Sequence, residues 1–271
     1  MFAAGRAAKL GPVIFTGGRG GGFSWRSGGW EISAYHMREE MTKRQLEDAI
    51  FDAEDLEDAW DLEAGLYYDD LWWGNETGLS VNRALTPDWA LGVNVLQKRD
   101  NEGRNTVSTV QTGGLLPGDI LVDVELGISD GDLGYGNGVF AALSHSDETL
   151  RYRAKFYQAD ADFKGYYRNQ RYLGAEFNYQ AEGSPWDVRG YYRRQQLNLD
   201  LLPDLSAPLD EDALLGMGYV WPGGDRLGLD LRYRHIRDLQ PDSDADAIEH
   251  ALRLDFSKLL AEHDLSLSGN I

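Results

Sequence analysis

The stretch that decides the fold is Arg226-Leu227-Gly228-Leu229-Asp230-Leu231-Arg232-Tyr233-Arg234, in which apolar and charged side chains alternate. Side chains on a β-strand point alternately to opposite faces, so this order places the leucines on one face and the charges on the other. A helix, with 3.6 residues per turn, would mix both kinds on each face. Residues 226–234 are therefore predicted to form a strand with one apolar and one charged face.

The same period of two dominates the chain from about residue 62 onward. It recurs over residues 120–128, 150–156, 173–181, 186–192 and 248–256. Segments such as 171–181, 186–197 and 226–237 are long enough for the roughly 9 to 11 residues that a tilted strand needs to cross a bilayer. They exceed the roughly 5 to 6 residues that are usual for strands of soluble proteins. The length of these segments favours strands that span a membrane.

The connections between the predicted strands alternate in length in the C-terminal half. Short connections are expected at residues 146–148, 182–185, 222–225 and 261–263, and long polar ones at 159–170, 198–212 and 238–247. Two further connections are expected at residues 113–118 and 129–138. In an antiparallel up-and-down sheet every second connection lies at the same end, and transmembrane barrels have short turns at one end and longer loops at the other. The alternation indicates an up-and-down arrangement.

Composition excludes several classes of function. The chain of 271 residues carries a net charge of −19, which repels nucleic-acid phosphates. It has no cysteine, so disulfides, thiolate nucleophiles and cysteine-bound zinc are excluded. No apolar run approaches the ~18 to 20 residues that a membrane-spanning helix needs. The chain is therefore either soluble or spans a membrane with strands.

The N-terminal part, residues 1–61, differs from the region 62–271. Residues 23–26 and 30–34 are expected to be strands on either side of a turn at 27–29. From residue 42 to about 60 the period changes, because apolar residues fall near helical spacing and Thr42 with Gln45 resembles a capping box. We expect one short acidic helix near residues 42–60, either as a plug or rim element or as an amphipathic excursion of a loop, the second being favoured.

Residues from about 76 to 271 resemble the barrel portion of Gram-negative outer-membrane proteins. The resemblance depends on the period of two, on the alternation of short and long connections, and on aromatic residues at strand ends, which are Trp89, Trp186, Trp221 and Tyr233. It implies an all-β, antiparallel up-and-down transmembrane β-barrel of about 14 to 16 strands, with lipid outside and a polar lumen. It further implies the bacterial outer membrane as location and outer-membrane lipid and lipopolysaccharide as partners. The alternating pattern continues to Ile271, so we expect the chain to be a piece of a longer barrel that it need not close.

The expected function is a pore, an export channel or a surface anchor, with an exported protein or small solutes as the passing species. The polar faces of successive strands would line the lumen with charges of both signs, which are Arg151, Arg153, Glu176, Asp187, Arg189, Arg193, Asp230, Arg232, Arg234, Arg253 and Asp255. The alternative is a secreted, soluble all-β binding module for carbohydrate or cell-surface adhesion, because one apolar face suits a protein core as well as lipid.

Other constellations are weaker. Oxygen ligands alternate in the loops at residues 130–137 and 242–246, but neither has the spacing of a calcium loop, and acidic loops without metal are the favoured interpretation. The five histidines have no metal-binding spacing, and no nucleophile elbow is present. We therefore expect no enzyme, no cofactor and no metal site.

Overall fold

The computed structural model describes the backbone of residues 2–9, 15–42, 71–100, 103–132, 134–165, 168–203, 205–260 and 263–270, and side chains within 21–38, 75–99, 103–132, 134–165, 168–203 and 205–258. The chain divides into two compact units, which are described separately below. Unit 1 comprises residues 1–112, 125–139 and 162–168, and unit 2 comprises residues 113–124, 140–161 and 169–271.

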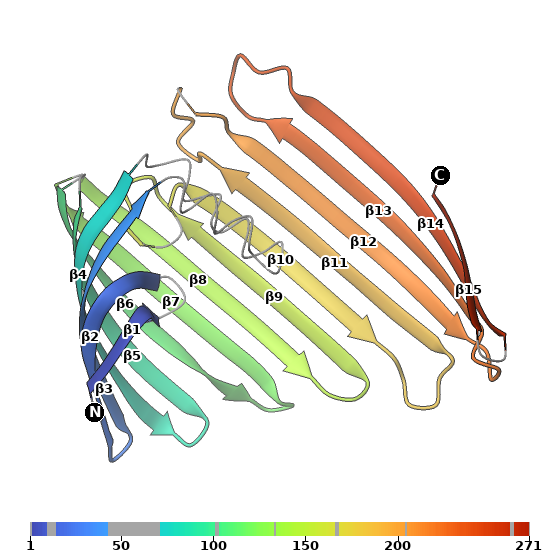
Figure 1. Ribbon diagram of the computed structural model, residues 1–271, viewed down its shortest axis with the longest axis horizontal. Helices are drawn as coiled ribbons and strands as arrows, with labels where there is room; N and C mark the ends of the chain where they lie inside the picture. The colour runs from blue at the N-terminus through green and yellow to red at the C-terminus, as the bar shows by residue number, and fades with distance from the viewer. Residues whose placement is uncertain are drawn as a thin grey trace. The chain divides into compact units, whose positions relative to one another are not determined.

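The described part of the chain is a single antiparallel sheet whose strands neighbour one another in chain order (Figure 1). Its fifteen strands are β1 (Phe2–Lys9), β2 (Phe15–Ser27), β3 (Trp30–Thr42), β4 (Leu71–Thr86), β5 (Trp89–Asp100), β6 (Gly103–Leu116), β7 (Ile120–Gly131), β8 (Gly134–Ser146), β9 (Leu150–Ala159), β10 (Gln170–Tyr179), β11 (Trp186–Leu197), β12 (Pro208–Val220), β13 (Arg226–Asp238), β14 (Asp246–Leu260) and β15 (His263–Asn270). The predicted all-β, up-and-down architecture is confirmed. The order runs from β1 to β15 without a described pairing between these two strands, so barrel closure stays a prediction.

Unit 1 contains the hairpins from β1 to β5, and its β2–β3 turn shows how local sequence fixes register. Gly28 and Gly29 form the two-residue connection, with φ angles of 58° and 80°. Positive φ at both positions is the geometry of the tight hairpin turn whose twist matches the flanking strands, and glycine adopts it without steric cost. The turn pairs Ser27 with Trp30 and sets the pairing of β2 with β3. The strands predicted at 23–26 and 30–34 are confirmed and are longer than expected.

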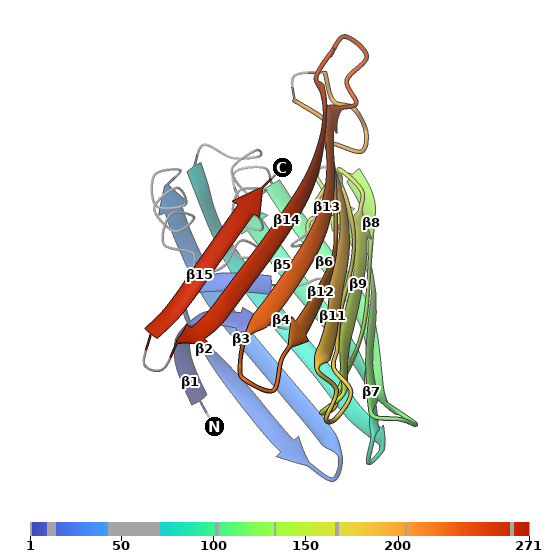
Figure 2. The ribbon, with the colours of Figure 1, turned by 90° about the vertical axis from the view of Figure 1, so that its right-hand side faces the viewer.

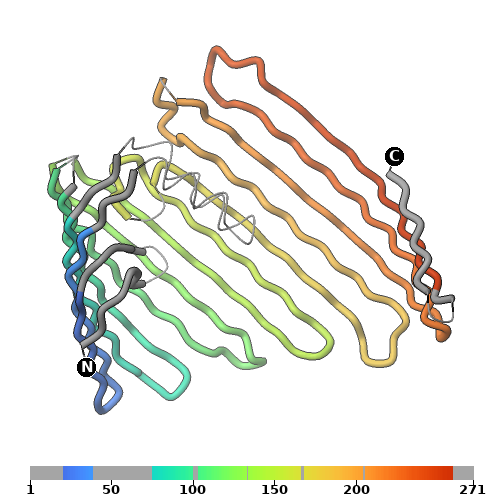
Figure 3. Tube along the Cα trace, viewed as in Figure 1, coloured from blue at the N-terminus to red at the C-terminus, as the bar shows by residue number. Residues whose placement is uncertain are grey.

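Unit 2 contains β9 to β15, and β11 to β14 lie side by side in both ribbon views (Figures 1 and 2). The connections at 180–185 and 221–225 leave the lower end of these strands in Figure 1, whereas the longer ones at 198–207 and 239–245 leave the upper end. Figure 3 follows the chain through these hairpins. The predicted alternation of short and long connections is confirmed here.

The prediction of a loop at residues 129–138 is wrong. β7 continues to Gly131 and β8 begins at Gly134, so only residues 132–133 connect the two strands. Gly136 and Gly138 lie within β8, where their missing side chains leave room for Phe163.

Two further expectations need correction. β6 continues to Leu116, so the connection expected at 113–118 is the turn 117–119. β12 begins at Pro208, so the last third of the loop expected at 198–212 is strand. The helix expected near residues 42–60 is not confirmed. Thr42, its expected first cap, ends β3, and residues 43–70 lie outside the described part of the chain.

The burial pattern is the reverse of that of a soluble protein. In unit 1 the buried side chains of β4 and β5 include Glu76, Ser80, Asn94 and Lys98. On the other face of these two strands the large apolar side chains are exposed, Leu79 by 45% and Val93 by 46%. Each strand thus buries a largely polar face and exposes an apolar one. Among the described residues, no helix is long and apolar enough to cross a membrane.

Candidate pore lining

All eleven side chains that the sequence predicts to line a lumen lie on one face of β9 to β14. The pairing shows this directly, because partners opposite each other in an antiparallel sheet point to the same side. One row across the strands runs Arg151, Asn178, Arg189, Gly216, Asp230, Arg253. The neighbouring rows on that face contain the other predicted residues. We call this surface of unit 2 the charged face.

Ion pairs cross between strands on the charged face. Arg189 Nη2 donates to Asp230 Oδ1 at 2.8 Å. Arg226 Nη2 lies 3.3 Å from Asp187 Oδ2, and Arg153 Nε lies 3.1 Å from Glu176 Oε1. The guanidinium groups of Arg153 and Arg226 are about half exposed, at 58% and 48% of the side chain. Such exposed pairs contribute little to stability, about 0 to 1 kcal/mol each. Their effect is to keep charges of both signs fixed along the face.

The most buried carboxylate of the charged face, Asp212, was missed by the sequence analysis. Its residue is 1% exposed. Arg232 donates to it twice, from Nε at 3.0 Å and from Nη2 at 2.8 Å. Arg193 Nη2 donates at 3.3 Å, and the Tyr191 hydroxyl at 3.2 Å. Asp212 therefore joins β11, β12 and β13 through a cluster of charge-assisted hydrogen bonds.

A second missed carboxylate lies two residues away on the same strand. Asp210 accepts from Arg234 Nη2 at 3.0 Å. Both aspartates were placed in a loop because Pro208 and the consecutive Leu214 and Leu215 hide the period of two. The spacing of Asp210 and Asp212, with both on the same face, was the signal in the sequence that could have identified them.

The opposite face of unit 2 is apolar and exposed. Leu215, Leu231 and Leu254 are exposed by 54%, 51% and 51%. Near the short turns this face carries aromatic rings in contact, with centroids 4.6 Å apart for Trp186 and Tyr219 and 4.9 Å apart for Tyr219 and Trp221. We call this surface the apolar face.

At the strand ends next to the long connections, the apolar face carries charged residues. Arg194 Nε lies 3.3 Å from Glu211 Oε1, and His235 Nε2 lies 2.7 Å from Asp246 Oδ1. Arg194, Glu211 and His235 are opposite one another in the pairing of β11, β12 and β13. The apolar face is thus bounded by aromatic rings at one end and by a charged row at the other.

In unit 1 the buried polar face carries a hydrogen-bond chain instead of exposed arginines. Asn94 Nδ2 donates to Thr109 Oγ1 at 3.0 Å, and the Thr109 hydroxyl donates to the carboxylate of Glu125. Glu76 Oε1 lies 3.1 Å from Lys98 Nζ. The side chains of this pair are only 1% and 10% exposed, in contrast to the arginines of unit 2.

Part of the β9–β10 connection, residues 162–165, covers the polar face of unit 1. Phe163 is fully buried, and a Cβ added to Gly138 would lie 2.7 Å from its ring. Ser129 fixes the backbone on both sides, since its hydroxyl donates to Asp162 O at 3.0 Å and accepts from Lys164 N at 3.2 Å. Glycines and one serine thus form the docking surface for this segment, which we call the docked loop.

The acidic loops give no sign of a metal centre. The described residues contain no group of three or more His, Asp or Glu side chains placed to hold a metal ion. The charges on the polar faces are instead arranged in pairs and chains that join different strands.

Solved structures similar to this chain include the following three. OccK11 (OpdR) of Pseudomonas aeruginosa aligns over 98% of this chain and 73% of its own, with 11% identity and a TM-score of 0.46. OccAB2 of Acinetobacter baumannii aligns over 98% and 72%, with 8% identity and a TM-score of 0.43. The outer membrane protein opdK of Pseudomonas aeruginosa aligns over 94% and 72%, with 12% identity and a TM-score of 0.44.

No protein-family model matches the chain, and no curated protein matches its sequence. At the identities and TM-scores given above, the structural similarities carry no functional conclusion.

Proposed function

We propose that the chain forms the wall of an outer-membrane β-barrel pore, with the charged face toward an aqueous lumen and the apolar face toward lipid. The observation that carries this is the reversed burial of neighbouring strands, in which Leu231 is 51% exposed while Asp212 is 1% exposed. In a bilayer only helices and closed barrels satisfy all backbone hydrogen bonds. Strands with an apolar outer face are therefore expected to close into a barrel, in this chain or with further strands.

The dimensions of the apolar face support this proposal. Trp186, in the aromatic cluster, and Arg194, in the charged row, lie on the same face of β11 and are eight positions apart. Eight residues span about 26 Å along a strand. With the usual tilt of 35–45°, this is about 20 Å along the membrane normal, which approaches the ~25 Å apolar band of outer-membrane barrels.

Small hydrophilic solutes suit this lumen better than an exported protein. The docked loop, with Phe163 at its centre, occupies part of the polar face of unit 1 and narrows a passage that this face lines. The charged face adds guanidinium and carboxylate groups in matched pairs, which favour polar solutes without a strong preference for one sign. The soluble binding module is disfavoured, because it would need to cover the exposed apolar face.

The experiment uses the absence of native cysteine. Leu231→Cys and Arg232→Cys are adjacent in β13 but lie on opposite faces, so they are matched probes. The full chain is refolded into lipid vesicles and treated with a charged, membrane-impermeant thiol reagent in water. We expect rapid labelling at position 232 and at least tenfold slower labelling at 231, whereas a lipid-soluble maleimide should label position 231.

Conductance across a planar bilayer provides the second measurement. Labelling of Arg232→Cys is expected to change the single-channel conductance, and the same treatment of Leu231→Cys should leave it unchanged. Equal labelling at both positions, or a chain that is soluble without detergent and shows no heat-dependent shift in gel mobility, would refute the proposed function.

A further inference from the structure

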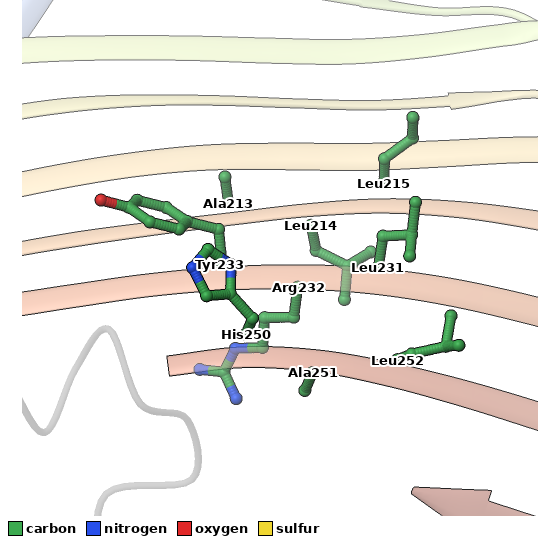
Figure 4. Close-up of a pocket in the computed structure, with 9 residues that line it drawn as sticks. All are labelled: Ala213, Leu214, Leu215, Leu231, Arg232, Tyr233, His250, Ala251 and Leu252. Carbon is green, nitrogen blue, oxygen red and sulfur yellow. The ribbon is translucent and has the colours of Figure 1, made fainter. Parts of the chain in front are cut away.

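A shallow groove crosses the apolar face of β12, β13 and β14, with a volume of about 500 Å³ (Figure 4). One side is formed by Tyr233 and His250, whose ring centroids are 5.3 Å apart, and the other by leucines in the next row on this face. Its lining residues are Ala213, Leu214, Leu215, Leu231, Arg232, Tyr233, His250, Ala251 and Leu252.

The groove has the width of a single hydrocarbon chain. Its two sides are rows two residues apart, for example Tyr233 and Leu231 on β13, which is about 7 Å along a strand. Carbon atoms in contact are about 3.5 to 4.0 Å apart, so one chain of carbon atoms lies between the rows in contact with both. The row between them, which includes Arg232, directs its side chains to the charged face, as the contacts of Arg232 with Asp212 show.

The charged row lies next to the aromatic side of the groove. His235 follows Tyr233 by two positions on the same face of β13, and Arg237 follows by four. Arg237 is exposed and lies opposite Asp246 in the pairing with β14. The Arg237 guanidinium, four residues from Tyr233 toward the long connection, is placed to contact the phosphate of a lipid whose chain lies in the groove.

We propose that this groove binds one acyl chain of a phosphorylated glycolipid, the lipid anchor of lipopolysaccharide, with its phosphate near Arg237. The site rests on the proposed function, since it requires the apolar face to meet lipid and the long connections to lie on the cell surface, as in other outer-membrane barrels. Competing lipid chains are as apolar as the groove, so burial of apolar surface alone gives no preference. Selectivity comes from the fit between the rows and from the charged contact.

The experiment fills the groove and removes the charge separately. Ala213→Phe places a ring within the groove, and Ala175→Phe on β10 is its control, in the same cross-strand row but outside the groove. Arg237→Gln removes the guanidinium, and Arg171→Gln is its control, three strands away in the same row as Arg237. Native mass spectrometry of the full chain in detergent measures binding of added hexa-acylated, bis-phosphorylated lipid A.

We expect at least tenfold weaker binding for Ala213→Phe and about threefold to tenfold weaker binding for Arg237→Gln, with both controls within twofold of wild type. Neutral diacylglycerol should bind wild type and Arg237→Gln equally. Equal binding of lipid A by wild type and Ala213→Phe, in proteins that keep the thiol-labelling pattern of the pore, would overturn the lipid site alone. If Leu231→Cys and Arg232→Cys, each in an otherwise unchanged chain, do not show the expected difference in labelling, the proposed function itself would be overturned.

Discussion

Replacing Phe163 by alanine is expected to release the docked loop from the polar face of unit 1. The side chain is fully buried and fills the space that the glycines of β7 and β8 leave because they lack side chains. Loss of a buried phenylalanine side chain from a core costs about 3 to 5 kcal/mol. We use the low end, because a loop relaxes more easily than a core. The two hydrogen bonds of Ser129 remain, at 3.0 and 3.2 Å.

The assay is tryptic cleavage after Lys164, which lies beside Phe163 and is 7% exposed in the native protein. When opening and closing are fast, proteolysis follows the population of the open form. A cost of about 3 kcal/mol raises that population roughly 100-fold, since every 1.4 kcal/mol is a factor of ten. Mass spectrometry of the fragments should therefore show cleavage after Lys164 about 100-fold faster in Phe163→Ala than in wild type.

The control for this prediction is Leu202→Ala, in the β11–β12 connection, where the side chain is 40% exposed. It should leave cleavage after Lys164 unchanged. If Phe163→Ala is cut after Lys164 no faster than wild type, the ring does not hold the docked loop and the reasoning fails.

Three further outcomes are expected. Gly138→Val should expose the docked loop to trypsin as Phe163→Ala does, because its Cβ would lie 2.7 Å from the ring, while Gly223→Ala, with no heavy atom within 4 Å of its Cβ, should not. Asp212→Asn should lower the free energy of unfolding in urea by about 1 to 3 kcal/mol, discounted for its partly exposed arginine partners, and shift the reversal potential toward anions. The pKa of Asp147 is held at about 2, chiefly by the hydrogen bond from the N–H of Leu150. The stability that this carboxylate gives the fold is therefore complete above about pH 4 and is lost as the pH falls toward 2. The free energy of unfolding of Asp147→Ala should depend less on pH over that interval.

The strands and their faces could be predicted from the sequence because alternation depends only on local geometry. Residues 226–234 alternate without interruption, and their charges lie on one face in the structure as expected. The eleven predicted lining residues share a face for the same reason. The contacts between strands did not have to be known, because a period of two fixes the face of each residue once the segment is a strand.

The docked loop and the Asp212 cluster could not be predicted, because both depend on partners distant in sequence. Ser129 and Phe163 are brought together by docking across a sheet, and no local pattern records this contact. The glycines of β7 and β8 leave room for Phe163 because they lack a side chain, and no local pattern in the sequence indicates this. Asp212 is identified only once Arg193 and Arg232 are placed on the strands beside it.

The arrangement of charge also bears on which side of the sheet meets water. Asp212 and its two arginines would be costly in a dry interior, because the desolvation of three charges exceeds what one carboxylate and two guanidinium groups regain. The arginine side chains keep 28% and 37% of their surface exposed, which gives water access to the cluster. On the other face, exposed leucines such as Leu215 and Leu231, at 54% and 51%, would be unfavourable in water. Water on the charged face and lipid on the apolar face, as in the proposed pore, would remove both costs.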